Sequence, residues 1–184
     1  MERKLLKDLC AWRANKNRMP LILQGARQVG KSWLLQEFGK QYYDNVVHIN
    51  LETNKSAHDL FDGDLTPSRI ITYLESLTSQ TIFPEKTLLI LDEIQACPRA
   101  LTSLKSFTEE APQYHIAAAG SLLGVAIHRE DFSYPVGKVI EMRLYPLDFE
   151  EWLMALGQAS LLEQIQIHFR TNEKMPTPLH EVAL

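Results

Sequence analysis

Gly25-Ala-Arg-Gln-Val-Gly30-Lys31-Ser32 matches the pattern G-x-x-x-x-G-K-[ST] at every fixed position. The apolar residues Leu21-Ile-Leu23 precede it and read as a short strand. Residues 31–43 follow, with apolar side chains spaced to share one face of a helix. Because the pattern requires a strand before it and a helix after it, we interpret the segment as a phosphate-binding loop and not as a chance glycine turn.

This loop predicts a site for a nucleotide and Mg²⁺. Its glycines let the backbone N–H groups point at phosphate oxygens, and the helix that follows adds the positive end of its dipole. We expect Lys31 to reach the β- and γ-phosphates as a catalytic residue, and the Ser32 hydroxyl to bind Mg²⁺. The other expected nucleotide contacts are Gly25, Ala26, Arg27, Gln28, Val29, Gly30 and Trp33. For Arg27 the alternative is exposure to solvent, and for Trp33 it is packing against the protein.

A second pattern lies at the end of the apolar stretch Thr87-Leu-Leu-Ile-Leu91, which reads as a strand buried on both faces. Asp92 and Glu93 follow it. We expect Asp92 to hold the magnesium ion and Glu93 to orient and deprotonate the attacking water. The alternative is an acidic pair that stabilises a helix N-terminus. The complete phosphate-binding loop upstream favours the functional interpretation.

A third candidate follows the small-residue strand His115-Ile-Ala-Ala-Ala119, which ends at Gly120 and Ser121. In P-loop ATPases that carry an additional strand, a polar residue at this place senses the γ-phosphate and positions the water. Ser121 is the candidate for that catalytic role, since it occupies the corresponding position. An ordinary turn at the end of a strand is the alternative.

Strand and helix patterns alternate along the chain. Helices are expected at residues 1–19, 31–43, 66–78, 98–110, 148–156 and 160–170, and strands at residues 21–23, 46–51, 87–91, 115–119 and 138–144. Residues 52–64 are polar, with a turn signal at Asp62-Gly63-Asp64. Alternation of this kind predicts an α/β fold, a parallel sheet with helices on both faces.

Composition narrows the possible partners. The 184 residues allow one domain with a sizeable core, and the net charge of -4 gives no electrostatic reason to expect direct nucleic-acid binding. Cys10 and Cys97 form no metal or redox spacing and read as reduced thiols. We find neither a signal peptide nor an apolar run of the ~18 residues that a membrane span needs. A cytoplasmic protein without a membrane partner is the expectation.

Several longer stretches make the interpretation more specific: Leu91-Asp-Glu-Ile-Gln-Ala-Cys-Pro-Arg-Ala100, Leu104-Lys105-Ser-Phe107, Ala119-Gly-Ser-Leu-Leu-Gly124, Tyr134-Pro-Val-Gly-Lys138 and Leu144-Tyr-Pro-Leu-Asp-Phe-Glu-Glu151. As a set they resemble a prokaryotic family of AAA-type ATPases over most of residues 18–157. The resemblance implies a P-loop NTPase fold with a five-stranded sheet of order 5-1-4-3-2. It also implies ATP as the nucleotide, and the sequence contains no Asn-Lys-x-Asp-like guanine reader.

Members of the resembled family pair an N-terminal ATPase domain with a C-terminal domain of unknown function. The apolar spacing predicts an N-terminal helix at 1–19. The resemblance implies a P-loop ATPase domain at 20–157, followed by a helical linker and tail at 158–184 directed toward an absent C-terminal domain. The chain looks like a fragment or a truncated gene product. The apolar face formed by Leu161, Leu162, Ile165 and Ile167 is expected to contact the absent domain.

One residue departs from the pattern of the resembled family. Many relatives have an arginine where this chain has Lys138, and such an arginine can act on the nucleotide of a neighbouring copy in a homo-oligomer. Lysine cannot make the planar bidentate contact of arginine. Arg99, Arg129 and Arg143 are other candidates, but the interpretation of each as a surface charge is favoured, and none is selected for this role.

The sequence predicts an ATP hydrolase. The alternatives are a nucleotide-gated binding switch with slow hydrolysis, or the motor portion of a DNA-transaction protein whose contact domain is missing. A P-loop kinase is disfavoured because the sequence shows no arginine-rich lid and has Asp-Glu after the strand.

Overall fold

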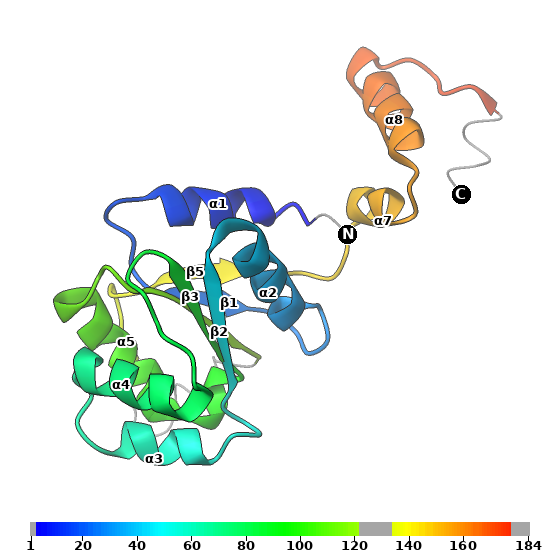
Figure 1. Cartoon of the computed structure of the whole chain (residues 1–184). Coiled ribbons are helices and arrows are strands. Elements are labelled where there is room, and N and C mark those ends of the chain that lie inside the picture. Colours follow the sequence, from blue (N-terminus) through cyan, green and yellow to red (C-terminus); the bar gives the residue numbers. More distant parts are fainter. Residues whose placement is uncertain (1–2, 122–133, 178–184) are drawn as a thin grey trace.

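The computed structural model of the chain describes residues 3–121 and 134–177. Within them, one sheet contains β1 (Leu21–Gln24), β2 (Asn45–Asn50), β3 (Thr87–Asp92), β4 (His115–Gly120) and β5 (Ile140–Arg143). The helices are α1 (Leu6–Ala14), α2 (Lys31–Tyr42), α3 (Ser56–Asp62), α4 (Pro67–Thr78), the short 3-10 helix η1 (Ile94–Ala96), α5 (Pro98–Glu110), α7 (Phe149–Ala155) and α8 (Ala159–Thr171). The predicted α/β fold is confirmed (Figure 1).

The strands lie in the order β2-β3-β4-β1-β5, which is the predicted order read from the opposite edge. All neighbouring pairs are parallel. Every residue of β3 and β4 is buried, which explains their nearly continuous runs of apolar or small residues. Gln24 pairs with Gly120, and Asn50 pairs with Asp92. The segments that follow β1, β3 and β4 therefore leave the sheet at the same edge.

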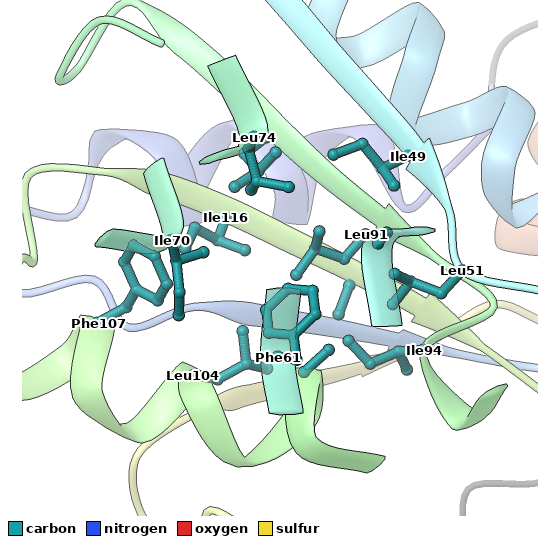
Figure 2. Close-up of a cluster of buried hydrophobic side chains, with 14 of the residues drawn as sticks. Ile49, Leu51, Phe61, Ile70, Leu74, Leu91, Ile94, Leu104, Phe107 and Ile116 are labelled. Atoms are coloured by element: carbon teal, nitrogen blue, oxygen red, sulfur yellow. The ribbon is translucent and has the colours of Figure 1, made fainter. Parts of the chain in front are cut away.

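Helices α3, α4 and α5 cover one face of the sheet (Figure 1). Figure 2 shows their side chains Phe61, Ile70, Leu74, Leu104 and Phe107 packed with the strand residues Ile49, Leu91 and Ile116. Full burial of a side chain of this size contributes roughly 1.5–3 kcal/mol relative to exposure. This cluster therefore fixes the strands whose ends carry the candidate acids.

Helices α1 and α2 cover the opposite face. Leu9 and Trp12 of α1 and Leu34, Leu35 and Phe38 of α2 pack with Leu21, Leu23, Leu88 and Ile90 of the strands. Successive side chains of a strand point to opposite faces. Leu88 and Ile90 accordingly belong to this cluster, while Leu89 and Leu91 belong to the other one.

Two segments differ from their predictions. The helix expected at residues 1–19 spans only Leu6–Ala14 among the described residues. Residues 56–62, expected to be part of a polar connection with a turn, form helix α3. Ala57, Leu60 and Phe61 are its buried residues, and their spacing of three and four positions places them on one helix face. The helix has only seven residues, so its packing on the sheet, rather than its own propensity, holds it together.

Helices α7 and α8 pack against each other and stand apart from the sheet (Figure 1). Their buried residues Leu153, Leu161 and Leu162 form a small cluster separate from the two that flank the sheet. Ile165, expected on an apolar face, packs against this cluster, while Ile167 is exposed. Among the described helices, none has the length and apolar character needed to cross a membrane.

Candidate functional site

The candidate phosphate-binding loop lies between β1 and α2, and it needs glycine at Gly25 because of close packing and at Gly30 because of backbone conformation. A Cβ atom on Gly25 would lie 2.3 Å from the carbonyl oxygen of Leu144. Gly30, the N-cap residue of α2, has a φ of 92°, a conformation that glycine adopts without steric cost. Gln28 also has a positive φ, 64°. The loop therefore curls tightly before α2 begins at Lys31.

The ammonium group of Lys31 lies against the loop that precedes it. Lys31 is only 5 % exposed, and its Nζ donates hydrogen bonds to the carbonyl oxygens of Gly25 at 3.0 Å and Ala26 at 2.8 Å. Burial lowers the pKa of Lys31, and the negative charges of Glu93 and Asp92 act in the opposite direction. The structure thus brings the candidate phosphate-binding cation close to the two candidate acids.

Asp92, the last residue of β3, is buried, and its carboxylate takes part in several hydrogen bonds. Its Oδ2 lies 3.1 Å from Nε2 of His48, and its Oδ1 accepts a hydrogen bond from the N–H of Glu93 at 3.0 Å. The Ser32 side chain also lies close enough to interact with this carboxylate. Burial tends to raise the pKa of Asp92, but these hydrogen bonds outweigh burial and hold the pKa below its ordinary value. Asp92 is therefore an ionised carboxylate at neutral pH.

The hydroxyl of Ser32 and the carboxylate of Asp92 together fit a hard divalent cation. Mg²⁺ binds oxygen ligands, and in nucleotide sites it uses one or two carboxylates together with substrate phosphates and water. In residues 3–121 and 134–177, no group of three or more His, Cys, Asp or Glu side chains is arranged to hold a metal ion. The pair thus suits a cation that arrives with a nucleotide better than a cage made of protein ligands alone.

Glu93 lies where the chain turns sharply out of β3. Its φ of 50° is unusual for a residue with a side chain, and the turn leads directly into η1. The residue is half-buried, and its Oε2 accepts a hydrogen bond from Nε2 of Gln95. A carboxylate placed in this way at the edge of the sheet can act as a proton acceptor.

Ser121 directly follows β4, the strand between β3 and β1, so it lies at the same edge of the sheet. It is only 1 % exposed. Its Oγ is buried without a hydrogen-bond partner among the described residues. Such a hydroxyl costs about 1–3 kcal/mol when it stays unpaired. Its environment is therefore one that a bound polar ligand can improve.

The remaining candidate contacts of the loop are accessible from solvent. Ala26, Arg27 and Gln28 are exposed, while the Val29 side chain packs against the cluster under α1 and α2. Trp33, in the first turn of α2, is 42 % exposed. This exposure argues against core packing as the role of Trp33.

Arg99, a candidate for action on a neighbouring nucleotide, is bonded within its own chain. Its Nε donates to the carbonyl oxygen of Phe61 at 2.6 Å, and its Nη2 donates to that of Gly63 at 2.8 Å. These carbonyls lie at the C-terminal end of α3, where helix carbonyls have no partner within the helix. Arg99 therefore caps α3, a role that its sequence position did not reveal.

The other residues considered for that role differ in surroundings. Arg143 is exposed at the end of the edge strand β5. Lys138 forms an ion pair with Glu109, with 2.9 Å between Nζ and Oε1. Arg129 lies outside the described residues. The geometry does not select any of the three.

Sequence reasoning missed two residues of the site. His48 contacts Asp92 from the neighbouring strand β2, and Arg3 donates a hydrogen bond from its Nη1 to the carbonyl oxygen of Val29 at 3.1 Å. A polar residue within a strand was a usable signal for His48. Arg3 gave no comparable signal, because its partners lie far away in the sequence.

Comparison with known proteins supports the same fold. The model of a family described as an AAA domain matches residues 17–153. No curated protein matches the chain. Among solved structures, Drosophila ORC bound to DNA is 15 % identical, with a TM-score of 0.50 over 90 % of this chain and 48 % of that one. At this identity the likeness extends to the fold alone.

Two further solved structures have lower TM-scores. PCH-2 of C. elegans is 16 % identical, with a TM-score of 0.47 over 86 % of this chain and 47 % of that one. AMPPCP-bound DnaA from Aquifex aeolicus is 14 % identical, with a TM-score of 0.42 over 98 % of this chain and 54 % of that one. The chain spans about half the length of these structures.

Proposed function

The chain belongs to the AAA-domain family, and from this premise we propose that it binds ATP with Mg²⁺ and hydrolyses the ATP to ADP and phosphate. The observation that carries the proposal is the grouping of the Ser32 side chain, the Asp92 carboxylate and the buried ammonium group of Lys31 at the N-terminal end of α2. A hydroxyl, an ionised carboxylate and a cation at one helix N-terminus match the needs of a nucleoside triphosphate and its divalent ion.

Binding of the triphosphate is proposed to change the partners of Lys31. Its Nζ now donates to two loop carbonyls, and phosphate oxygens, which are charged, are stronger acceptors. The N–H groups of the loop and the N-terminus of α2 add further donors and a positive dipole end. Lys31 then neutralises charge on the β- and γ-phosphates without leaving the loop.

Ser32 and Asp92 are the residues that would hold the divalent ion, which supplies further positive charge to the phosphate oxygens when bound. The low pKa of Asp92 keeps its carboxylate ionised for this purpose. The hydrogen bond from His48 fixes the orientation of the same carboxylate. Such an outer contact preorganises the ligand.

Glu93 is proposed to orient the attacking water and to accept its proton. Water then attacks the γ-phosphorus in line with the bond to the β-phosphate, which breaks as ADP leaves. Ser121, whose hydroxyl lacks a partner among the described residues, is proposed to contact the γ-phosphate or the water. Both residues directly follow strands that end at the same edge of the sheet, close to the loop that leads to Lys31.

Thermal unfolding of the wild type and of Lys31→Ala, with Mg-ATP and with Mg-GTP, tests the binding part of this proposal. At a concentration of about 100 times Kd, a ligand stabilises a folded protein by about 2.7 kcal/mol. For a chain of this size the corresponding rise in Tm is roughly 5–10 °C. We expect that rise with Mg-ATP in the wild type and its loss in Lys31→Ala. The absence of any shift in the wild type would overturn the proposal.

A nucleotide-gated switch with slow hydrolysis is the second candidate, and the contact between Gln95 and Glu93 favours it. One oxygen of the candidate base already accepts a hydrogen bond, so the carboxylate is partly engaged before any water arrives. If this contact restrains turnover, Gln95→Ala should hydrolyse ATP faster than the wild type at unchanged affinity. An equal or lower rate in Gln95→Ala would remove the reason for preferring the switch.

A further inference from the structure

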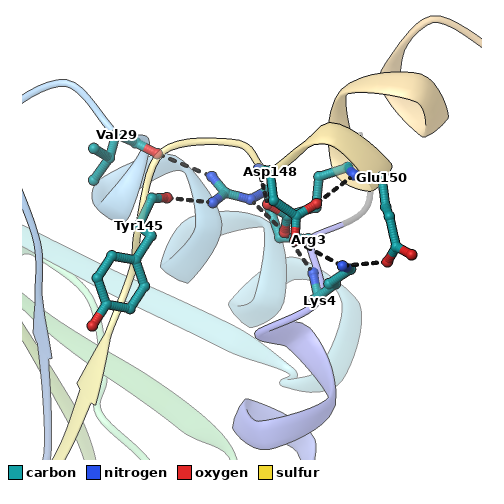
Figure 3. A network of polar contacts seen from close by, with 7 residues as sticks. Arg3, Lys4, Val29, Tyr145, Asp148 and Glu150 are labelled. Carbon is teal, nitrogen blue, oxygen red and sulfur yellow. Dashed lines mark hydrogen bonds and ion pairs between the residues drawn. The ribbon is translucent and has the colours of Figure 1, made fainter. Parts of the chain in front are cut away.

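Arg3 ties the candidate phosphate-binding loop to the segment after β5 and to α7 (Figure 3). It is 4 % exposed. Its Nη1 donates to the carbonyl oxygen of Val29 at 3.1 Å, its Nη2 donates to that of Tyr145 at 2.6 Å, and its Nε donates to Oε1 of Glu151 at 3.0 Å. We call these three contacts the Arg3 clasp. A single guanidinium group thus joins the chain near its N-terminus to the loop and to residues 145–151.

Glu151 is the acidic side of the clasp and is also buried, at 5 % exposure. Its Oε1 also accepts the backbone N–H of Lys4 at 2.8 Å, and its Oε2 accepts that of Asp148 at 3.3 Å. Asp148 and Glu151 form the capping box that begins α7. A buried ion pair is costly to leave half-broken, so the N-terminal end of α7 and Arg3 hold each other in place.

The contact with Val29 orients the loop itself. A trans peptide unit is planar, with its C=O and N–H groups pointing in opposite directions. A Val29 carbonyl that is held toward Arg3 therefore directs the N–H of Gly30 away from Arg3. That N–H belongs to the loop expected to bind phosphate. A loss of the clasp frees this peptide unit to rotate.

The other end of the clasp lies at the start of α7, which packs against α8. These helices have their own small hydrophobic cluster, formed by Leu153, Leu161 and Leu162 with neighbouring residues. Figure 1 shows them standing apart from the layered sheet and helices. Polar contacts at the start of α7 therefore attach this helix pair to the rest of the molecule.

We propose that Arg3 is a positioning residue that couples the nucleotide loop to α7 and α8. The inference rests on the proposed nucleotide binding at Lys31. Nucleotide binding orders the loop, strengthens the contact between Val29 and Arg3, and so holds the N-terminal end of α7 more firmly. By reciprocity, the factor by which nucleotide favours the closed clasp equals the factor by which the closed clasp raises nucleotide affinity. Breaking the clasp therefore lowers nucleotide affinity.

The chain offers a matched control next to Arg3. Lys4 forms ion pairs with Asp148 and Glu150 at the same end of α7, but its side chain is 47 % exposed. Exposed pairs of this kind contribute little. The Lys4 side chain also makes no contact with the loop among the interactions of Figure 3. Lys4→Ala therefore removes neighbouring charge without breaking the clasp.

The test compares the wild type, Arg3→Lys, Glu151→Gln and Lys4→Ala. Arg3→Lys keeps the charge but lacks the planar guanidinium group that presents separate nitrogens to the three acceptors. Glu151→Gln weakens the same ion pair from the other side. Each is titrated with a non-hydrolysable ATP analogue and Mg²⁺, and amide hydrogen exchange in residues 149–171 is measured with and without the analogue. Thermal unfolding without nucleotide records whether each variant is folded.

We expect the analogue to slow exchange in α7 and α8 of the wild type and of Lys4→Ala. In Arg3→Lys and Glu151→Gln this nucleotide-dependent slowing should disappear, and Kd should rise on the order of tenfold, within the usual range of such couplings. Folded clasp variants with wild-type affinity and wild-type slowing would overturn the coupling while leaving nucleotide binding intact. No binding by the wild type would overturn both proposals.

Discussion

Gly25 approaches the segment after β5 so closely that there is no room for a methyl group. The Cβ atom of an alanine would lie 2.3 Å from the carbonyl oxygen of Leu144, so the loop or that segment must move. We expect Gly25→Ala to reduce the free energy of unfolding by roughly 1–3 kcal/mol, as overpacking does, and to weaken ATP binding. Chemical denaturation and nucleotide titration measure the two effects.

Gly157→Ala is the control for this substitution. Gly157 also has a positive φ, 74°, but a Cβ atom there would meet no atom within 4 Å. It should lose some stability from backbone strain alone and should bind ATP like the wild type. Equal ATP affinity of Gly25→Ala and Gly157→Ala would show that the close approach to Leu144 is irrelevant to the site.

The Asp92 carboxylate is the proposed protein ligand of Mg²⁺, so its removal should change the Mg²⁺ dependence of ATP hydrolysis. Asn has the size of Asp but no negative charge, so Asp92→Asn retains packing and loses attraction for a divalent cation. We expect the Mg²⁺ concentration for half-maximal ATP hydrolysis to rise by at least about tenfold. Asp44→Asn, at an exposed position, is the control. An unchanged Mg²⁺ dependence in Asp92→Asn would rule out the proposed role of this carboxylate.

The site residues that could be predicted from the sequence are those that lie within a short continuous motif. Lys31 and Asp92 each lie in a run of neighbours with a defined order, and the structure brings these two runs together at one edge of the sheet. His48 and Arg3 lie in no such run. Their importance comes from contacts across strands or across the chain, which a single sequence does not display.

Helix α3 depends on an arginine of another helix. Arg99, near the start of α5, donates hydrogen bonds to the carbonyl oxygens of Phe61 and Gly63 at the end of α3. We expect Arg99→Ala to lower the free energy of unfolding by about 1.5–3 kcal/mol, the usual contribution of hydrogen bonds to charged groups. ATP hydrolysis by the folded variant should remain at the wild-type rate. Normal stability with strongly reduced hydrolysis would instead indicate a direct role at a nucleotide.

The start of β4 contains a buried histidine that should make the protein sensitive to acid. Nδ1 of His115 lies 2.8 Å from the hydroxyl of Tyr43. Burial, helped by the charges of Arg18 and Arg13, lowers the pKa of His115 from 6.5 to about 4. The unfolded chain therefore takes up a proton below pH 6.5, while the folded protein resists doing so until about pH 4.

Because the pKa of His115 is lower in the folded state than in the unfolded state, the free energy of unfolding decreases as the pH falls. The contribution of His115 is complete above about pH 6.5 and decreases by roughly 3 kcal/mol on the way to pH 4. Denaturation of the wild type and of His115→Gln at a series of pH values measures it. The variant should show a shallower loss of stability between pH 6.5 and 4. Parallel curves for the two proteins would show that His115 does not titrate in this way.

Elements with clear apolar periodicity were predictable, and a helix within a polar segment was not. The boundaries of α4 and α5 agree with the expected helices at 66–78 and 98–110, because their apolar positions and initial prolines are clear signals. Helix α3 was missed because a polar segment with a turn signal conceals three buried residues. Its tertiary packing decides its conformation, and local sequence cannot show that packing.

On the scale of the whole molecule, parallel strand order explains how the distant patterns meet. The order β2-β3-β4-β1-β5 places β3, β4 and β1 side by side, so the residues after each strand converge at one edge. This order was expected from the family resemblance and not from periodicity. The division into an N-terminal helix, a domain at 20–157 and a tail remains a prediction, as does the absent C-terminal domain.

The central claim is that the site at the ends of β1, β3 and β4 hydrolyses ATP and that Glu93 acts as the general base. The most direct test is phosphate release by the wild type and by Glu93→Gln at saturating Mg-ATP, with Kd measured for both. We predict Kd values within about twofold of each other, since Gln keeps the shape of Glu. Phosphate release should fall by about a hundredfold or more in the variant, the usual contribution of a general base. Release at the wild-type rate by Glu93→Gln, or no release by the wild type, would contradict the account.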